Sequence, residues 1–182
     1  MGKTLYLALA ALLAGCASNS PYKHLENWLI REDPVRRFAV PADIFYVQGD
    51  LYTNVAKISP MNFYAQSEVG RGRFNGVARV FSPLITTEED LECALDWYFS
   101  VHHEKKRPII FIGEGEGGAF LKKYEEEHAD DLKDLGLVAS FYTDDARKGF
   151  VNQEMVKQIK DAIARARYTA IWGREMPAGM QN

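Results

Sequence analysis

The chain has 182 residues, a formal charge of −3 and an isoelectric point near 5.8, and it contains no run of basic residues. These values argue against nucleic acid as a partner, because binding to phosphates needs a concentration of Lys and Arg. Hydrophobic residues make up 47% of the chain, which is typical of a packed domain and argues against intrinsic disorder.

The first residues have the composition of a secretory signal. Lys3 supplies a positive charge, and the apolar run at 5–12 is too short to span a bilayer. The run leads into Leu13, Ala14, Gly15 and Cys16, and polar residues follow. This order resembles the lipobox of bacterial lipoproteins. The resemblance implies cleavage before Cys16 and lipid on this residue, both on its thiol and on the new amino terminus.

Lipid on Cys16 would hold the mature chain to a bilayer. Each buried methylene contributes about 0.8 kcal/mol, and because one acyl chain binds only marginally, stable attachment needs at least two. The alternative is an ordinary signal peptide that happens to contain a cysteine. Inner-membrane lipoproteins tend to carry aspartate after the cysteine, where this chain has Ala17. The resemblance therefore implies the outer membrane, facing the periplasm, if the cell is Gram-negative.

Removal of the signal at 1–15 leaves 167 residues, enough for one domain with a core. Because Lys3 is lost, 21 basic residues remain against 25 acidic ones, and the charge becomes about −4. Residues 16–37 are expected to form the lipidated N-terminus and a tether. Residues 38–173 are expected to form the domain, and residues 174–182 a tail.

Strands and helices alternate through the predicted domain. Apolar runs predict strands at 43–48, 76–81, 108–112 and 137–142, and a last short strand at 168–172.

Helices are predicted between these strands. Thr86 and Glu89 form a capping box that predicts the start of one helix. Another is predicted after the glycine-rich turn at 113–118, and an amphipathic pattern predicts a third from residue 151. This alternation predicts one α/β domain of three layers, in which a mostly parallel sheet has helices on both faces.

The glycine-rich turn lies between a predicted strand and a predicted helix, where ligands and catalytic groups sit in open α/β sheets. Gly113, Gly115 and Gly118 satisfy the dinucleotide fingerprint G-x-G-x-x-G. However, Glu114 and Glu116 would lie close to the pyrophosphate, and a carboxylate about 6 Å from a phosphate charge costs roughly 3 kcal/mol at an effective dielectric constant near 20. Both carboxylates are favourable at a helix N-terminus without any ligand. No cofactor is therefore expected.

The same turn also has the context of a nucleophile elbow, G-x-S-x-G, with glycine in place of the serine. Four segments occur in a characteristic order around it: Asp43-Ile-Phe-Tyr-Val, Phe74-Asn-Gly-Val-Ala-Arg-Val-Phe-Ser-Pro, Arg107-Pro-Ile-Ile-Phe-Ile-Gly and Leu137-Val-Ala-Ser-Phe-Tyr. Together they resemble an uncharacterised bacterial branch of the α/β-hydrolase superfamily, over about residues 38–145. The resemblance implies a shortened α/β-hydrolase-like fold.

The chain departs from this family where catalysis is expected. Active-looking members read Gly-His-Ser-Gln-Gly at the elbow, where this chain reads Gly113-Glu114-Gly115-Glu116-Gly117. They also carry a His-Pro pair where this chain has Gln48 and Gly49. The elbow is therefore degenerate, and its nucleophile position carries no side chain.

The family mechanism needs a serine at 115, an acid after a later strand and a histidine further along. The four histidines, His24, His102, His103 and His128, all precede the predicted strand at 137–142. Asp144 and Asp145 could be remnants of the triad acid. Loss of the nucleophile or the base alone costs on the order of 10⁶ in turnover, so no catalytic triad is expected.

Some assignments stay open. Glu114 or Glu116, with Asp144 or Asp145, could act as acid or base in a different reaction. Asp50, Tyr52 and Asn54 could line a remnant pocket or simply lie at the surface. The adjacent residues His102, His103 and Glu104 point in different directions, so no metal site is expected there.

The expected function is binding or scaffolding at the cell envelope. The expected partners are the lipid bilayer, through acylated Cys16, and an envelope protein or a small ligand in a remnant cleft. An enzyme that uses the cleft carboxylates is the main alternative. A degenerate paralogue without a present role is another.

Overall fold

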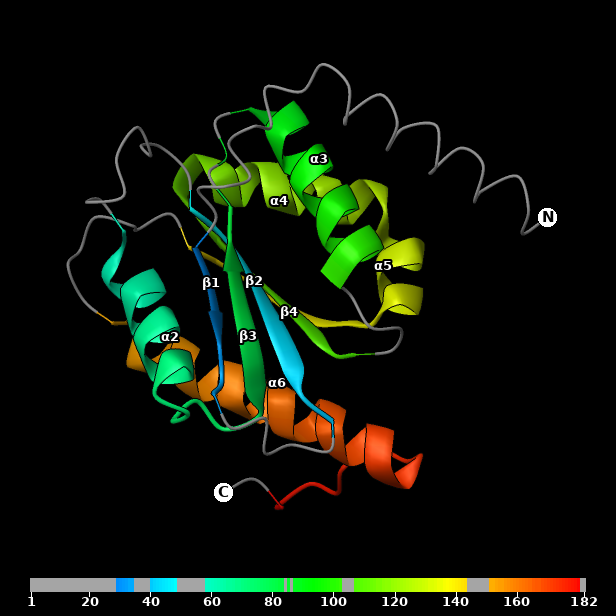
Figure 1. Ribbon diagram of the computed structural model, residues 1–182. Helices are drawn as coiled ribbons and strands as arrows, with labels where there is room; N and C mark the ends of the chain where they lie inside the picture. The colour runs from blue at the N-terminus through cyan, green and yellow to red at the C-terminus, as the bar shows by residue number, and fades with distance from the viewer. Residues whose placement is uncertain are drawn as a thin grey trace.

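The computed structural model describes residues 29–34, 40–48, 58–83, 85, 87–102, 107–143 and 151–180. They form a sheet with helices on both sides (Figure 1). The strands are β1 (Leu29–Glu32), β2 (Ala42–Gln48), β3 (Val77–Ser82), β4 (Ile109–Glu114) and β5 (Leu137–Thr143). The helices are α2 (Pro60–Gly70), α3 (Glu88–Trp97), α4 (Gly115–Glu127), α5 (Ala129–Leu135) and α6 (Gln153–Trp172), and a π-helical turn at Tyr98–His102 continues α3.

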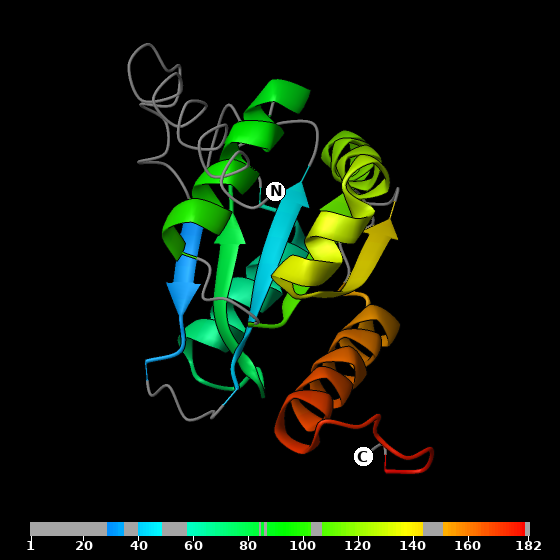
Figure 2. The same ribbon diagram turned by 90° about the vertical axis from the view of Figure 1, so that its right-hand side faces the viewer.

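The described strands lie in the order β1-β3-β2-β4-β5. β2 pairs in parallel with β3 and β4, β5 pairs in parallel with β4, and β1 is antiparallel to β3. Figure 2 shows the arrow of β1 pointing opposite to those of β2, β3 and β5. The carboxyl ends of the four parallel strands therefore meet at one edge of the sheet, here called the carboxyl edge. The prediction of an α/β domain with a mostly parallel sheet is confirmed.

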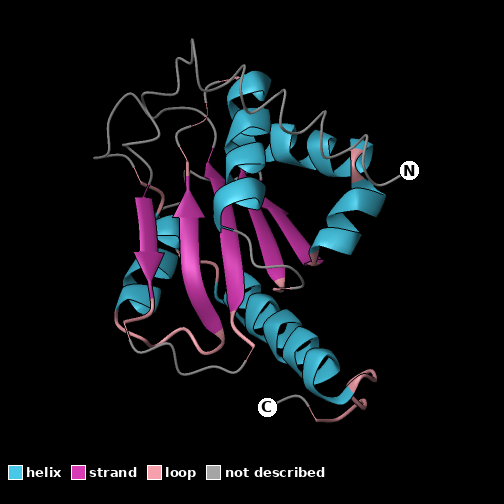
Figure 3. Cartoon of the chain, turned by 45° about the vertical axis from the view of Figure 1, so that its right-hand side comes forward, coloured by secondary structure: helices cyan, strands magenta, loops and turns pink. Residues whose placement is uncertain are grey.

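Two apolar clusters separate the sheet from its helices. Along β2, Ile44 and Tyr46 face one cluster, which α2 and α6 cover, while Phe45 and Val47 face the other, which α3, α4 and α5 cover. Figure 3 shows these helices on opposite sides of the strands. β2 and β4 are buried along their whole length because both faces and both edges are covered. They read as continuous apolar runs for this reason.

The strands predicted at 43–48, 76–81, 108–112 and 137–142 are confirmed, with bounds within two residues of β2, β3, β4 and β5. The capping box predicted at Thr86 is wrong by one residue. Thr87 caps α3 instead: its hydroxyl accepts the Asp90 N–H at 3.1 Å, and the Asp90 carboxylate accepts the Thr87 N–H at 3.0 Å. The sequence Thr-Thr-Glu-Glu-Asp contains two overlapping boxes, and the later one forms.

The strand predicted at 168–172 is wrong, because these residues are the last turns of α6. Tyr, Thr, Ile and Trp favour strands locally. No Gly or Pro interrupts the helical pattern before Gly173, which ends the helix in a left-handed conformation with φ of 64°. The long amphipathic pattern therefore outweighs local strand propensity.

Two further elements differ from the sequence-based expectation. α2 had not been predicted; it begins with Ser59 as N-cap and Pro60 in its first turn. It buries Asn62 and Gln66 beside Met61, Ala65 and Val69, which hides its apolar periodicity. β1 lies in the segment 16–37, for which a tether is expected, so the sheet starts earlier in the chain than residue 38.

The signal at 1–15 and Cys16 lie outside the described residues. Among the helices that the structure does describe, none is long and apolar enough to cross a bilayer.

Candidate functional site

The glycine-rich turn connects β4, which lies between the middle strand β2 and β5, to α4 (Figure 1). Gly113 and Glu114 end the strand, and Gly115 is the first residue of the helix. Gly115 has a φ of +58°, in the left-handed region that residues with a Cβ rarely adopt. The turn therefore has the sharp strand-to-helix geometry of a nucleophile elbow, with no side chain at the nucleophile position.

Gly113 and Gly118 have a packing role. A Cβ on Gly113 would lie 2.6 Å from the Gly118 Cα and 2.8 Å from the Tyr142 ring, and a Cβ on Gly118 would lie 2.7 Å from the Gly113 carbonyl carbon. α4 can approach β4 this closely only without side chains at these two positions. Together with the positive φ of Gly115, this contact accounts for all three glycines of the dinucleotide fingerprint without a ligand.

Gly115→Ser is expected to lower the melting temperature of the domain. A residue with a Cβ in the left-handed region costs about 1–2 kcal/mol, which corresponds to about 2–8 °C for a domain of this size. Thermal unfolding followed by circular dichroism would measure the shift. Gly115→Ala should cost as much, and Gly115→Asn should cost less because Asn tolerates this conformation. An unchanged or raised melting temperature for Gly115→Ser would contradict the strain argument.

Of the histidines and acids considered for a triad, the structure describes only the side chain of His128, which does not lie at this turn. His128 separates α4 from α5 and is exposed, stacked on Tyr124 at 4.4 Å between ring centroids. The 13 residues of α4, about 20 Å of helix, separate it from the elbow. His24, His103, Asp144 and Asp145 lie outside the described residues, as do Asp50, Tyr52 and Asn54; the side chain of His102 is likewise not described.

Buried polar side chains gather at the carboxyl edge beside the elbow. Gln48 of β2 and Glu114 of β4 are partners in the sheet register. They belong to a group of six buried residues, here called the edge cluster: Tyr46, Gln48, Ser59, Asn62, Ser82 and Glu114. The resemblance to the hydrolase branch implies a histidine at position 48 and another at position 114. In this chain these two positions are neighbours in the sheet.

Hydrogen bonds join this cluster across three strands and the start of α2. The Gln48 Oε1 accepts from the Ser59 N–H at 3.0 Å and from the Asn62 side-chain amide at 3.3 Å. The same amide donates to the Ser82 Oγ at 2.7 Å. The Tyr46 and Ser59 hydroxyls lie 3.5 Å apart, and the Ser59 Oγ accepts the Asn62 N–H at 3.0 Å. The cluster therefore fixes α2 to the sheet beside the elbow.

Glu114 is the only carboxylic acid in the edge cluster, and its residue is 3% exposed. Burial raises the pKa of its carboxyl group above the ordinary value, and hydrogen bonds from the Ser59 and Tyr46 hydroxyls partly offset this. Glu114 shares its side of the sheet with Tyr46 and α2, whereas α4 packs on the other side. Glu116, by contrast, is exposed in the first turn of α4.

Glu114→Gln is expected to change how stability depends on pH. Because the folded protein has the raised pKa, the unfolded chain ionises first as the pH rises, and the wild type loses stability from the unfolded value, near 4.5, up through the folded pKa. Glutamine does not titrate, so the variant should gain stability relative to the wild type as the pH rises above about 4.5. Urea unfolding at several pH values would measure this; a constant difference would contradict the assignment.

A second buried polar group lies near the opposite edge of the sheet. The fully buried Asp43 carboxylate accepts two hydrogen bonds from Arg79, at 2.6 and 3.1 Å, one from the Tyr98 hydroxyl at 3.1 Å, and longer ones from Arg107 at 3.3 and 3.4 Å. Burial, and then the nearby Asp43 charge, raise the pKa of Tyr98 well above its usual range. Asp43, Arg79 and Arg107 each come from one of the segments that resemble the hydrolase branch, so these motif residues hold the fold together.

The edge cluster and the Asp43 group were not recognised from the sequence. Alternate residues of a strand share a face, so Glu114 lies on the same face as Ile112. Extending the strand predicted at 108–112 by two residues would therefore have placed Glu114 on the α2 side of the sheet. Charged residues inside apolar strands were the available signal for Asp43 and Arg79. Among the described residues, no group of three or more His, Cys, Asp or Glu side chains could hold a metal ion.

The comparisons with known proteins leave the family open. No model of a known protein family matches the chain, and no curated protein sequence matches it significantly.

Proposed function

We propose that this chain is a lipid-anchored lipoprotein of the cell envelope, with an α/β-hydrolase-like domain that binds or scaffolds and does not hydrolyse. The observation that carries the proposal is the turn at Gly115, which has the φ of +58° and the strand-to-helix position of a nucleophile elbow but no side chain to attack a substrate. A site of this shape without a nucleophile can still bind a ligand or a partner.

The sheet topology supports the hydrolase-like part of the proposal. The resemblance implies a mostly parallel sheet with helices on both faces, and the described strands form such a sheet, with one antiparallel strand at an edge. The neighbouring positions 48 and 114 support the loss of catalysis. Both carry residues other than the family's histidine, and both belong to a buried hydrogen-bonded cluster.

The alternative, an enzyme that uses cleft carboxylates, has less support. A general base must come within hydrogen-bonding reach of its substrate. Glu114 is 3% exposed and hydrogen-bonded beneath α2, so a substrate at the elbow would have to displace this packing. Glu116 is accessible, but none of the described residues supplies it with an acidic or basic partner at the elbow.

The lipid anchor is tested by metabolic labelling with an alkyne analogue of palmitate in a bacterial host. The wild type is expected to take up the label and to sediment with membranes, and Cys16→Ser should lose both. Cys93→Ser is the matched control, because Cys93 is the other cysteine of the chain and should not affect labelling. Label on the Cys16→Ser protein, or an unlabelled wild type, would refute the anchor.

The absence of hydrolysis is tested with a fluorophosphonate probe and a panel of activated esters. Neither the wild type nor Gly115→Ser is expected to react, because a restored serine would still lack a histidine base. Turnover that copurifies with the protein and disappears in Glu114→Gln or Glu116→Gln would instead favour the carboxylate enzyme.

A further inference from the structure

The last turns of α6 expose large apolar side chains. Ile171 is 52% exposed and Trp172 is 63% exposed, and Met180 in the following segment is 56% exposed. Tyr168 lies one turn before Trp172, with ring centroids 6.3 Å apart. At 3.6 residues per turn, Tyr168 and Trp172 lie on the side of the helix opposite the buried Ile159 and Ile163. The end of α6 therefore has a second apolar face that the described residues do not cover.

Basic residues surround this face in a chain that is acidic overall. Residues 157–175 contain five basic residues and two acidic ones, Asp161 and Glu175, so this stretch carries a net charge of +3. Arg165 and Arg174 are exposed. Tryptophan and tyrosine beside arginine are typical of protein segments at the membrane interface, where the rings lie at headgroup level and the guanidinium groups meet anionic lipid.

We propose that the C-terminal end of α6, through Tyr168, Ile171 and Trp172 with Arg165 and Arg174, lies on an anionic lipid surface. It would be a second membrane contact beside the acylated Cys16. The inference rests on the proposed anchor for its cellular setting, because the anchor brings the domain to a bilayer. Complementary charge favours lipid over a second copy of this chain, since pairing two copies of this face would bring like charges together.

The start of β1 and the α6 surface lie at opposite edges of the sheet. β1 starts at Leu29 opposite Ser82, at the carboxyl edge. Gly76, which precedes β3 at the other edge, contacts Ile163 and Arg167 of α6, and Figure 1 shows α6 continuing past the ends of the strands. The 20 residues of α6 measure about 30 Å. The 12 residues between Cys16 and β1 can span about 40 Å when extended, so both contacts can reach one bilayer.

Quenching of Trp172 fluorescence by brominated lipid tests the contact. The full chain with Trp28→Phe and Trp97→Phe, which leaves Trp172 as the single tryptophan, would be isolated from membranes and reconstituted into vesicles. Brominated phosphatidylglycerol is expected to quench Trp172 by about half or more, and brominated phosphatidylcholine should quench it much less. Arg165→Gln with Arg174→Gln should reduce the quenching, because each arginine at an anionic surface contributes about fivefold in binding. Lys122→Gln with Lys133→Gln, on α4 and α5, is the matched charge control.

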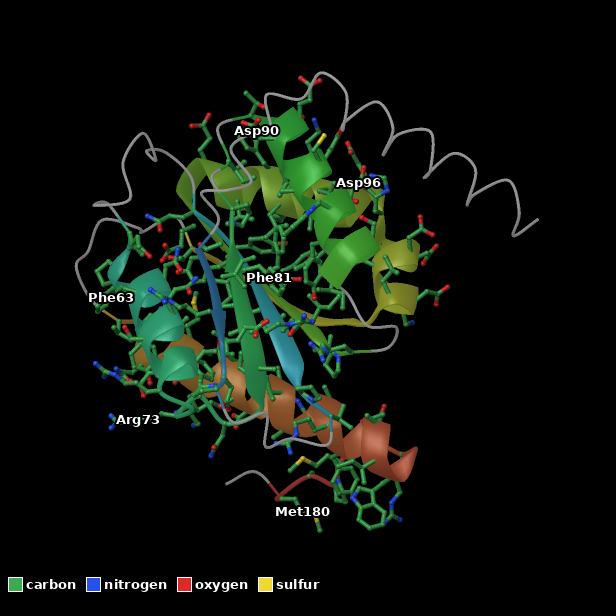
Figure 4. All side chains as sticks on the ribbon, in the orientation of Figure 1. Phe63, Arg73, Phe81, Asp90, Asp96 and Met180 are labelled. Atoms are coloured by element: carbon green, nitrogen blue, oxygen red, sulfur yellow. The ribbon has the colours of Figure 1, made fainter. Side chains whose placement is uncertain are left out.

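Phe63 provides the control for position. It has the same exposed fraction as Trp172, 63%, but lies on α2, and Figure 4 shows it far from Met180 at the other end of the molecule. A chain whose single tryptophan stands at this position (Phe63→Trp with Trp28→Phe, Trp97→Phe and Trp172→Phe) should not be quenched. Equal quenching of the two reporters, or burial of Trp172 in a dimer detected by light scattering, would overturn the proposal. Mass spectrometry of Cys16 separates the two hypotheses: quenching of Trp172 without acylation supports the α6 contact and refutes the anchor.

Discussion

Asp43→Ala is expected to destabilise the domain by about 3–5 kcal/mol, because it removes the carboxylate that neutralises two largely buried guanidinium groups. The side chains of Arg79 and Arg107 are 10% and 11% exposed, and Asp43 accepts hydrogen bonds from both as well as from Tyr98. The substitution would remove this shared acceptor from a low-dielectric interior. Urea unfolding followed by tryptophan fluorescence would measure it.

A second set of variants separates the value of the ion pair from the cost of breaking it. Asp43→Leu combined with Arg79→Met and Arg107→Met removes all three charges and keeps the apolar volume. Such replacements are often neutral or stabilising, so the triple variant should be more stable than Asp43→Leu alone. If Asp43→Ala costs less than about 1 kcal/mol, the Asp43 group does not have the structural role assigned to it.

Gly118→Ala is expected to destabilise the domain by about 3 kcal/mol, at the upper end of the range for overpacking. The added Cβ would lie 2.7 Å from the Gly113 carbonyl carbon and 3.0 Å from its oxygen. Both are backbone atoms of β4, so no side-chain rotation relieves the clash, and α4 has to move away from β4. The free energy of unfolding in urea is the measurement.

Gly70→Ala is the matched control for this prediction. Gly70 ends α2, and a Cβ there meets nothing within 4 Å. Alanine at such a position should be neutral or stabilise by about 0.4–1 kcal/mol, because it restricts the unfolded chain. A Gly118→Ala variant as stable as the wild type would mean that the glycine is not required for packing, and the dinucleotide interpretation of the turn would need to be reconsidered.

The sequence predicted the parallel strands well because their burial on both faces makes them continuous apolar runs. It failed for α2 because this helix turns Asn62 and Gln66 inward, toward polar groups that come from other parts of the chain. Such a helix has no clear apolar face, and only its cap, Ser59-Pro60, marks its start. The prediction of a strand at the C-terminal end of α6 was wrong for a different reason. The outward-facing residues there favour a strand when they are considered alone.

The sequence predicted where the candidate site lies in the chain but not how its side chains are arranged. The order of strand, glycines and helix correctly predicted a turn from strand to helix at Gly113 to Gly117. That Gln48 and Glu114 are neighbours depends on the pairing of β2 with β4, which a single sequence does not contain. The side to which Glu114 points depends on where β4 ends, and the predicted strand stopped two residues too early.

The position of β1 affects how the domain responds to force. If the chain is anchored at Cys16, β1 is the first of the described elements to bear tension from the membrane. It has four residues, and its one described strand partner is β3. Detachment of β1 would lengthen the tether by about 13 Å and leave the four parallel strands paired. Under tension, β1 would therefore detach first, while the glycine-rich turn and the parallel strands keep their structure.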